Sequence, residues 1–119
     1  MIQIWFLLIL SFLVPLSVVC AADDDGKYKA YGLGLKSCGI FVEQRRKKQD
    51  TGYVNWVEWY LTAVNMHTPT FSILGTTDIH GAMLLIENYR MKNPLKAFGV
   101  ALDSIFYELF PKRIIKAPK

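Results

Sequence analysis

The stretch that decides the fold is TGYVNWVEWYLTAVNM, residues 51–66. Asp50 precedes it and is a good N-cap residue. Four aliphatic residues follow one another at steps of three and four, the spacing of one helix face turned towards a core: Val54, Val57, Leu61 and Val64. Four aromatic residues widen this apolar surface: Tyr53, Trp56, Trp59 and Tyr60. We therefore expect this helix to be the central element of the domain.

Three further helices are expected on either side of it, over residues 33–48, 78–92 and 94–110. Thr77 or Asp78 would cap the third, and Asn93-Pro94 would end it and begin the fourth. The fourth has the cleanest apolar periodicity in the chain: Leu95, Phe98, Leu102, Ile105 and Leu109. Residues 67–77 form a loop that packs down onto the domain, and little of the sequence favours strands. The prediction is an all-α domain, a small bundle of about four helices.

The first 22 residues have the order of a secretory signal peptide. Residues 2–19 are almost wholly apolar, Cys20-Ala21-Ala22 supplies small residues for cleavage after Ala22 or Ala21, and three aspartates follow. An uncleaved membrane anchor and lipid attachment at Cys20 are the alternatives. We expect a signal peptide (1–22), a flexible linker (23–32), a helical domain (33–110) and a basic tail (111–119), in a periplasmic or secreted protein.

The net charge of +4 comes from 14 Lys and Arg against 10 Asp and Glu, all after the apolar segment. Positive charge gathers at residues 45–48 and in the tail, at Lys112, Arg113, Lys116 and Lys119. Such clusters suit the C-terminal ends of helices and a loose terminus. The alternative is contact with an acidic partner or an anionic membrane surface. No nucleic-acid motif is present, and we expect membrane contact only through an uncleaved signal segment.

Cleavage removes Cys20 and leaves Cys38 as an unpaired thiol in an oxidising compartment. Such a thiol is free, bridged to another chain, or buried as a small hydrophobe. A small enzyme using Cys38 or His80 is an alternative to a binding protein, but no strong catalytic motif is present. The two histidines, His67 and His80, lack the close paired spacing of a zinc site. We expect no cofactor, no metal and no catalysis.

The aromatic group on the central helix has two interpretations. Tyr53, Trp56, Trp59 and Tyr60 lie within eight residues, so they cannot all point to one side of a helix. Either the loop over residues 67–77 covers the outward-facing rings, or they form a partner-binding patch, because Trp and Tyr dominate interface energetics.

The order of these features resembles the HdeA/HdeB type of small periplasmic protein. After the signal peptide come a cysteine in the first helix (SCGIF, 37–41), a Trp-containing helix (VNWVEW, 54–59) and a Thr-Asp helix start (TDI, 77–79). A Cys-x-x-Asn-Pro pattern then ends the third helix, here RMKNP, 90–94. The exported, helical Rap/Tai-type amidase immunity proteins are a second resemblance.

The chain departs from the resemblance at Arg90, which replaces the second cysteine. The resemblance implies a disulfide from the first helix to that position, so Cys38 lacks its partner. Arg90 follows Ile86 by four residues and would lie beside the buried stripe, extending outwards or finding Glu43 or Glu87.

Together these features predict an exported, non-catalytic protein that binds another protein. The resemblance implies a chaperone-like or an immunity-like role. Acid chaperones expose apolar surface at low pH through their carboxylates, which fits poorly with a net basic chain.

Overall fold

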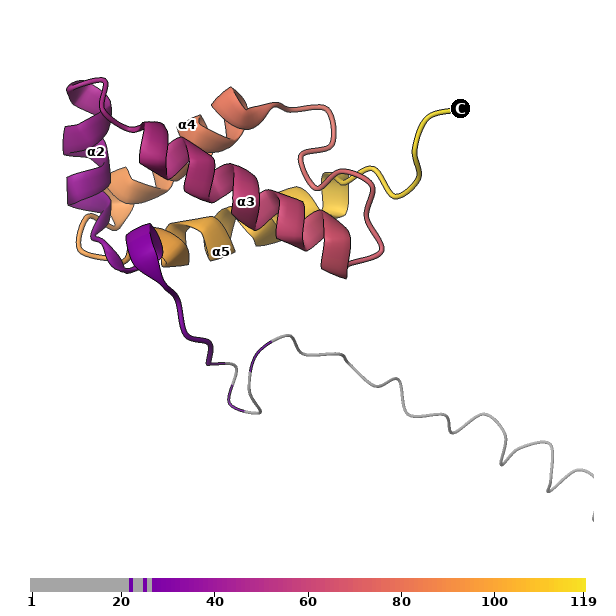
Figure 1. Ribbon diagram of the computed structural model, residues 1–119, viewed down its shortest axis with the longest axis horizontal. Helices are drawn as coiled ribbons and strands as arrows, with labels where there is room; N and C mark the ends of the chain where they lie inside the picture. Colours follow the sequence, from indigo (N-terminus) through magenta and orange to yellow (C-terminus); the bar gives the residue numbers. More distant parts are fainter. Residues whose placement is uncertain (1–21, 23–24, 26) are drawn as a thin grey trace, which may run out of the picture.

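The computed structural model describes residues 22, 25 and 27–119. Within these residues the chain forms four α-helices, α2 (Cys38–Arg46), α3 (Thr51–His67), α4 (Ile79–Lys92) and α5 (Phe98–Leu109), and two 3-10 helices, η1 (Gly32–Leu35) and η2 (Phe110–Lys112). The only β-pairing in this part is two isolated bridges. The prediction of a small all-α bundle is confirmed. Figure 1 shows α3 crossing in front of α5, with α2 at one end of the bundle and the C-terminal segment at the other.

The predicted helix over 33–48 is instead η1 followed by α2. Ser37 is extended and caps α2, accepting a hydrogen bond from Ile40 N. Gly34 in η1 lies so close to the indole of Trp56 that an added Cβ would be 2.5 Å from its Cζ2. A continuous helix fails here because the segment turns to cover Trp56 before α2 begins.

The junction between α4 and α5 also differs from the prediction. Asn93 ends α4, with its side chain donating to the Tyr89 carbonyl at 3.0 Å, but α5 begins at Phe98 and not at Pro94. The backbone between them pairs with the start of α2: Cys38 N donates to Lys96 O at 3.0 Å, and Phe98 N to Lys36 O at 2.8 Å. This pairing keeps Ala97 extended, and a turn over residues 94 and 95 precedes it. Leu95, predicted to lie on the buried stripe, lies in that turn and is 93% exposed.

The two predicted caps have different outcomes. Asp78 caps α4, and its Oδ1 accepts a hydrogen bond from Gly81 N at 2.8 Å. Asp50 makes no capping hydrogen bond to α3. Its carboxylate instead binds Arg45 Nη1 at 3.0 Å, so it joins the end of α2 to the start of α3.

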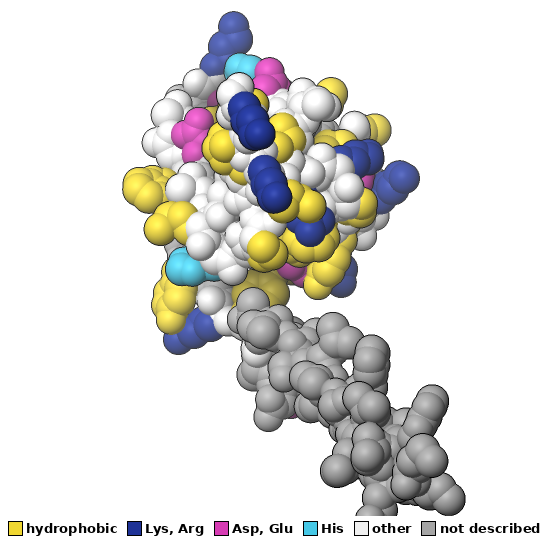
Figure 2. All heavy atoms as spheres, turned by 90° about the vertical axis from the view of Figure 1, so that its right-hand side faces the viewer, with side chains coloured by type: hydrophobic (Ala, Val, Ile, Leu, Met, Phe, Trp, Pro, Cys, Tyr) yellow, Lys and Arg dark blue, Asp and Glu magenta, His cyan; other side chains and the backbone are white. Residues whose placement is uncertain are grey.

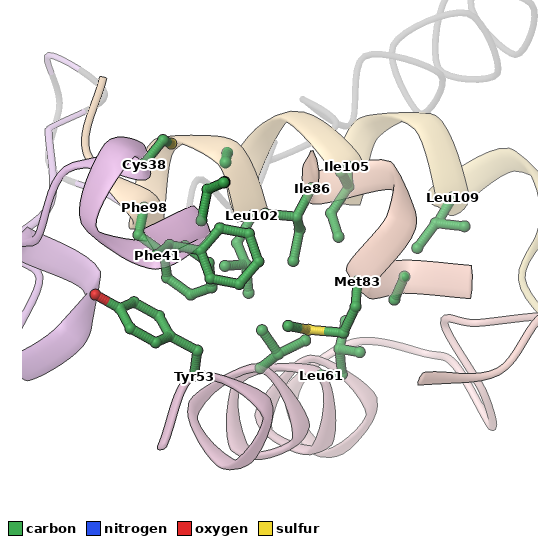
Figure 3. Close-up of a cluster of buried hydrophobic side chains, with 14 of the residues drawn as sticks. Cys38, Phe41, Tyr53, Leu61, Met83, Ile86, Phe98, Leu102, Ile105 and Leu109 are labelled. Atoms are coloured by element: carbon green, nitrogen blue, oxygen red, sulfur yellow. The ribbon is translucent and has the colours of Figure 1, made fainter. Parts of the chain in front are cut away.

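An aromatic cluster forms the part of the core beside α2 (Figure 3). The ring of Phe98 lies 4.9 Å from Phe41, 4.8 Å from Tyr53 and 5.8 Å from Trp56, measured between centroids. These residues come from α5, α2 and α3. Aliphatic residues of α4 and α5 extend the core towards the other end of the bundle: Met83, Ile86, Leu102, Ile105 and Leu109.

The tail from Lys112 pairs with the loop before α4, although the sequence predicts a loose terminus. Ser72 and Ile114 form an antiparallel bridge, with Ile114 N donating to Ser72 O at 2.9 Å and Ser72 N to Ile114 O at 3.0 Å. Gly75, with φ of +62°, brings the loop against the Lys112 carbonyl, where a side chain would collide. The loop thus packs down as predicted, and the tail packs with it.

The signal-peptide prediction falls on residues that, apart from Ala22, lie outside the described part of the chain. Among the helices described, none has the length and apolar character to cross a membrane.

Candidate functional site

Helix α3 distributes its four aromatic residues around the helix, as their spacing requires. Tyr53 is 4% exposed and belongs to the core, so its predicted place in a partner-binding patch is wrong. Trp56 and Tyr60 are partly buried, and Trp59 is 75% exposed. Tyr53 faces inwards because it precedes the core residues Val57 and Leu61 by one and two helical turns.

Trp56 and Tyr60 form a stacked pair at the edge of the core. Their ring centroids are 6.1 Å apart and their planes differ by 12°. Gly34 of η1 covers one side of the Trp56 indole. The loop over 67–77 is attached further along α3, where Asn65 Oδ1 accepts a hydrogen bond from Ile73 N at 2.8 Å. The N-terminal turn, and not the loop, is thus the part that covers Trp56.

Trp59 and Met66 extend this surface along the outward side of α3. They are seven residues apart, 75% and 72% exposed, and Ala63 between them is also exposed. A spacing of seven residues returns to the same helix face. Large exposed apolar side chains in a row are uncommon on a surface that meets only water.

Two more tyrosines lie near Tyr60. Burial raises the pKa of Tyr60, and the charges of Asp103, Tyr28 and Tyr107 raise it further. The pKa of Tyr28 is likewise raised by burial and then by Asp103 and Tyr107. Tyr28 and Tyr107 are still 54% and 69% exposed. Tyr28, in the segment before η1, and Tyr107, on the outer side of α5, are therefore close enough to Tyr60 for their charges to affect it.

We call this surface the aromatic face, made of six residues: Tyr28, Trp56, Trp59, Tyr60, Met66 and Tyr107. Sequence reasoning missed Tyr28 and Tyr107. Tyr28 lies in a stretch with no periodicity, and Tyr107 lies on the side of α5 away from its apolar stripe. Only the packing of α3 against the other segments brings them together.

Cys38 is a buried, free thiol at the first position of α2, with no exposed surface. Burial raises its pKa, and the positive charge of Arg90 opposes that shift only in part. A protonated thiol is a poor nucleophile, and a buried one cannot bridge to another chain. Cys38 is therefore an unreactive, buried cysteine that packs in the core.

The structure does not bring Cys38 and His80 together. His80 lies in the first turn of α4, whereas Arg90, which influences Cys38, lies in the last. Ten residues of α-helix separate them by about 15 Å along the axis. His80 is also exposed at the surface.

Arg90 is partly buried at the end of α4, and its Nε has no hydrogen-bond partner among the described residues. The two expected carboxylates are bound elsewhere. Glu87 makes a two-pronged contact with Arg45, at 2.9 and 3.3 Å, and Glu43 binds Lys47 at 2.6 Å. Of the two expected outcomes for Arg90, pairing with Glu43 or Glu87 is therefore wrong, and the side chain is partly exposed. The positive charge of Arg90 nevertheless lowers the pKa of Cys38, so Arg90 lies near that thiol.

No metal site or enclosed active site is evident in the described residues. They contain no group of three His, Cys, Asp or Glu side chains placed to hold a metal ion. One surface hollow lies between η1, α2 and the start of α3, and another beside Trp59, lined by Glu58 and Thr62. Neither is lined by Cys38 or by a histidine. The aromatic face is thus the strongest candidate for a functional surface.

Comparison of the chain with protein-family models, curated proteins and solved structures finds no match.

Proposed function

We propose that this chain is an exported, non-catalytic protein that binds another protein through its aromatic face. The observation that carries the proposal is the row of Trp59, Ala63 and Met66 on the outward side of α3. Trp and Tyr are enriched among the residues that contribute most binding energy at interfaces, because each buries a large area at little entropic cost.

The two parts of the aromatic face have different properties. Trp56 and Tyr60 are held in place by stacking and by η1, so they form a preorganised base. Trp59, Met66 and Tyr107 extend outwards, each more than two-thirds exposed. A rigid base beneath exposed anchors reduces the ordering cost of association.

Site-directed photocrosslinking in the producing cell tests this proposal. A photoreactive phenylalanine analogue is placed at Trp59 or at Met66, and at Met91 or Leu84 of α4 as exposed controls. We expect a crosslink to one protein from the α3 positions and not from α4. Equal crosslinking from all four positions, or none from α3, would count against the aromatic face.

The resemblance implies two possible roles, that of an immunity protein and that of a chaperone. An immunity-like protein would crosslink to one exported enzyme and inhibit it when the two purified proteins are mixed. A chaperone-like protein would crosslink to many unrelated proteins. The pattern of crosslinked partners therefore separates the two versions.

One structural feature is relevant to the acid-chaperone role. Arg45 joins α2 to α4 through Glu87 and to the start of α3 through Asp50. Both of these ion pairs would have to break before α2 could separate from the bundle. Client aggregation and tryptophan fluorescence should be followed from pH 7 to pH 2. If low pH does not increase the ability of the protein to prevent client aggregation, it does not act as an acid-activated chaperone.

Export has its own test, which is the intact mass of the protein recovered outside the cytoplasm, with and without thiol alkylation. Loss of about 22 residues would support the signal peptide. The full mass would favour an anchor, and an added acyl mass would indicate a lipid on Cys20. Alkylation of Cys38 only after unfolding is expected from its burial.

A further inference from the structure

The end of the bundle opposite α2 combines exposed apolar side chains with uncompensated positive charge. The Ser72–Ile114 bridge joins the loop to the tail, and its antiparallel register places Phe71 opposite Ile115. Phe71 is 52% exposed and Ile115 57% exposed, and Ile114, which precedes Ile115, is 36% exposed. We call this surface the tail face, made of six residues: Phe71, Lys112, Ile114, Ile115, Lys116 and Lys119.

The charged side chains of the tail all carry the same sign. Residues 111–119 contain Lys112, Arg113, Lys116 and Lys119 and no acidic side chain. Arg113 lies over the Phe110 ring, 3.7 Å from its centroid, and donates to the Phe110 carbonyl at 2.7 Å. The three lysines are exposed. Glu108, one helical turn before Lys112, and Asp78, which caps α4, are the nearest acidic residues in sequence.

Figure 2 faces this end of the molecule. Lys and Arg side chains lie across the middle of the face, directly beside hydrophobic ones, and the acidic side chains lie towards its margin. Aliphatic and aromatic side chains directly beside lysines match the layered chemistry of a phospholipid surface, where anionic headgroups cover an apolar interior.

We propose that the tail face docks the protein on an anionic phospholipid membrane. Phe71 and Ile115 enter the interfacial layer, and Lys112, Lys116 and Lys119 bind the lipid phosphates. This develops one alternative raised by the sequence, in which the basic residues of the tail contact an anionic membrane surface. The proposal is independent of partner binding at the aromatic face, which lies mainly along α3.

The pairing with the loop is what makes the tail a surface element. Three backbone hydrogen bonds hold Ile114 to Phe71 and Ser72, the shortest at 2.8 Å. The apolar residues are therefore preorganised, and docking does not require the segment to be ordered first. Each lysine that approaches an anionic surface strengthens binding by about fivefold, so the three together contribute about a hundredfold.

Vesicle sedimentation with phosphatidylglycerol vesicles, and with phosphatidylcholine vesicles for comparison, tests the charge requirement. The triple variant Lys112→Gln, Lys116→Gln, Lys119→Gln should bind phosphatidylglycerol about a hundredfold more weakly. The matched control is Arg46→Gln, Lys48→Gln, Lys92→Gln, which removes the same charge from exposed residues at the ends of α2 and α4. It should retain binding within about threefold. Equal loss in both variants would overturn the proposal, since net charge alone would then explain binding.

A fluorescent probe tests the site of contact, and it works whether or not the signal segment is retained. An environment-sensitive dye is attached at Ile115→Cys or, as the control, at Leu95→Cys, both in a Cys20→Ser background with single labelling checked by mass. Phosphatidylglycerol vesicles should shift the emission of the dye at position 115 to the blue and leave position 95 unchanged. Phe71→Ser should reduce that shift. An unchanged emission at 115, or binding of the tail face to an acidic protein in place of vesicles, would overturn the proposal.

Discussion

The exchange of Phe98 for alanine is expected to remove much of the stability of the domain. Phe98 has no exposed surface and contacts aromatic rings from α2 and α3, at centroid distances of 4.9, 4.8 and 5.8 Å from Phe41, Tyr53 and Trp56. Phe→Ala changes in cores cost about 3–5 kcal/mol, through lost transfer energy and the cavity left behind. A single small domain is stable by about 5–15 kcal/mol.

The matched variant is Leu95→Ala, three residues earlier. Leu95 is 93% exposed, so its truncation should change the free energy of unfolding by less than about 0.5 kcal/mol. If α5 instead began at Pro94 with Leu95 on its buried face, the same change would cost about 2–5 kcal/mol. The two variants therefore test where α5 begins as well as the role of the aromatic cluster.

Urea unfolding followed by far-UV circular dichroism is the appropriate assay. Tryptophan fluorescence is less suitable because Phe98 contacts Trp56 directly. If Phe98→Ala does not fold, Phe98→Leu provides a measurable variant. It keeps most of the buried apolar volume but loses the ring contacts, so it should lower the free energy of unfolding by about 1.5 kcal/mol. A cost below about 1 kcal/mol for Phe98→Ala, or equal costs for Phe98→Ala and Leu95→Ala, would refute this account of the core.

Three further predictions concern ion pairing, backbone geometry and pH. Arg45→Met should lower the free energy of unfolding by about 1–2 kcal/mol, because it removes partly buried contacts to Glu87 and Asp50. Lys47→Met removes an exposed ion pair and should change the free energy of unfolding by less than about 0.5 kcal/mol. Urea unfolding of both variants tests this, and equal effects would contradict it. Gly75→Ala should increase hydrogen exchange at Ile114 N, since φ is +62° and a Cβ would meet Lys112, while Gly39→Ala in α2 should leave it unchanged. Stability should fall as pH rises above about 9. Burial raises the pKa of Cys38 above 9.0 and the pKa values of Tyr28, Tyr53 and Tyr60 above 10.0 in the folded protein, so the unfolded chain releases these protons first. Guanidinium unfolding between pH 8 and pH 11 tests this, and constant or rising stability would contradict it.

The apolar periodicity of the sequence predicted the helices well where one face of a helix meets one core. The bounds of α3 and α4 agree with the predicted ranges within one residue at each end. Leu102, Ile105 and Leu109 are buried as their spacing requires. These residues depend on local pattern alone, which is why a single sequence is sufficient to place them.

The errors arise where distant segments meet. Leu95 continues the periodicity of α5, but residues 36–38 pair with residues 96–98 and hold the backbone extended there. Ile114 follows a helix-ending proline in a basic stretch, yet it pairs with Ser72, some forty residues away. Neither pairing leaves a local signal, because each depends on the relative placement of elements that the sequence pattern does not encode.

The candidate site was predicted in part for the same reason. Trp59 and the Trp56–Tyr60 pair come from one helix, so their spacing showed that some rings must face outwards. Tyr53 was misassigned because it was grouped with the other three rings, although it precedes Val57 and Leu61 by one and two helical turns and so lies on the buried face. Tyr28 and Tyr107 joined the face only through the packing of the N-terminal segment and α5 beside α3.

The most direct test of the proposed aromatic face is the affinity of its crosslinked partner, once purified, for two single variants. Trp59 and Met91 are both 75% exposed, on α3 and α4 respectively. Trp59→Ala should weaken binding by about thirtyfold or more, as expected for an interface Trp that contributes at least 2 kcal/mol. Met91→Ala should bind as the unaltered protein does. Equal affinities for the two variants would contradict the central claim that this protein acts through the aromatic face of α3.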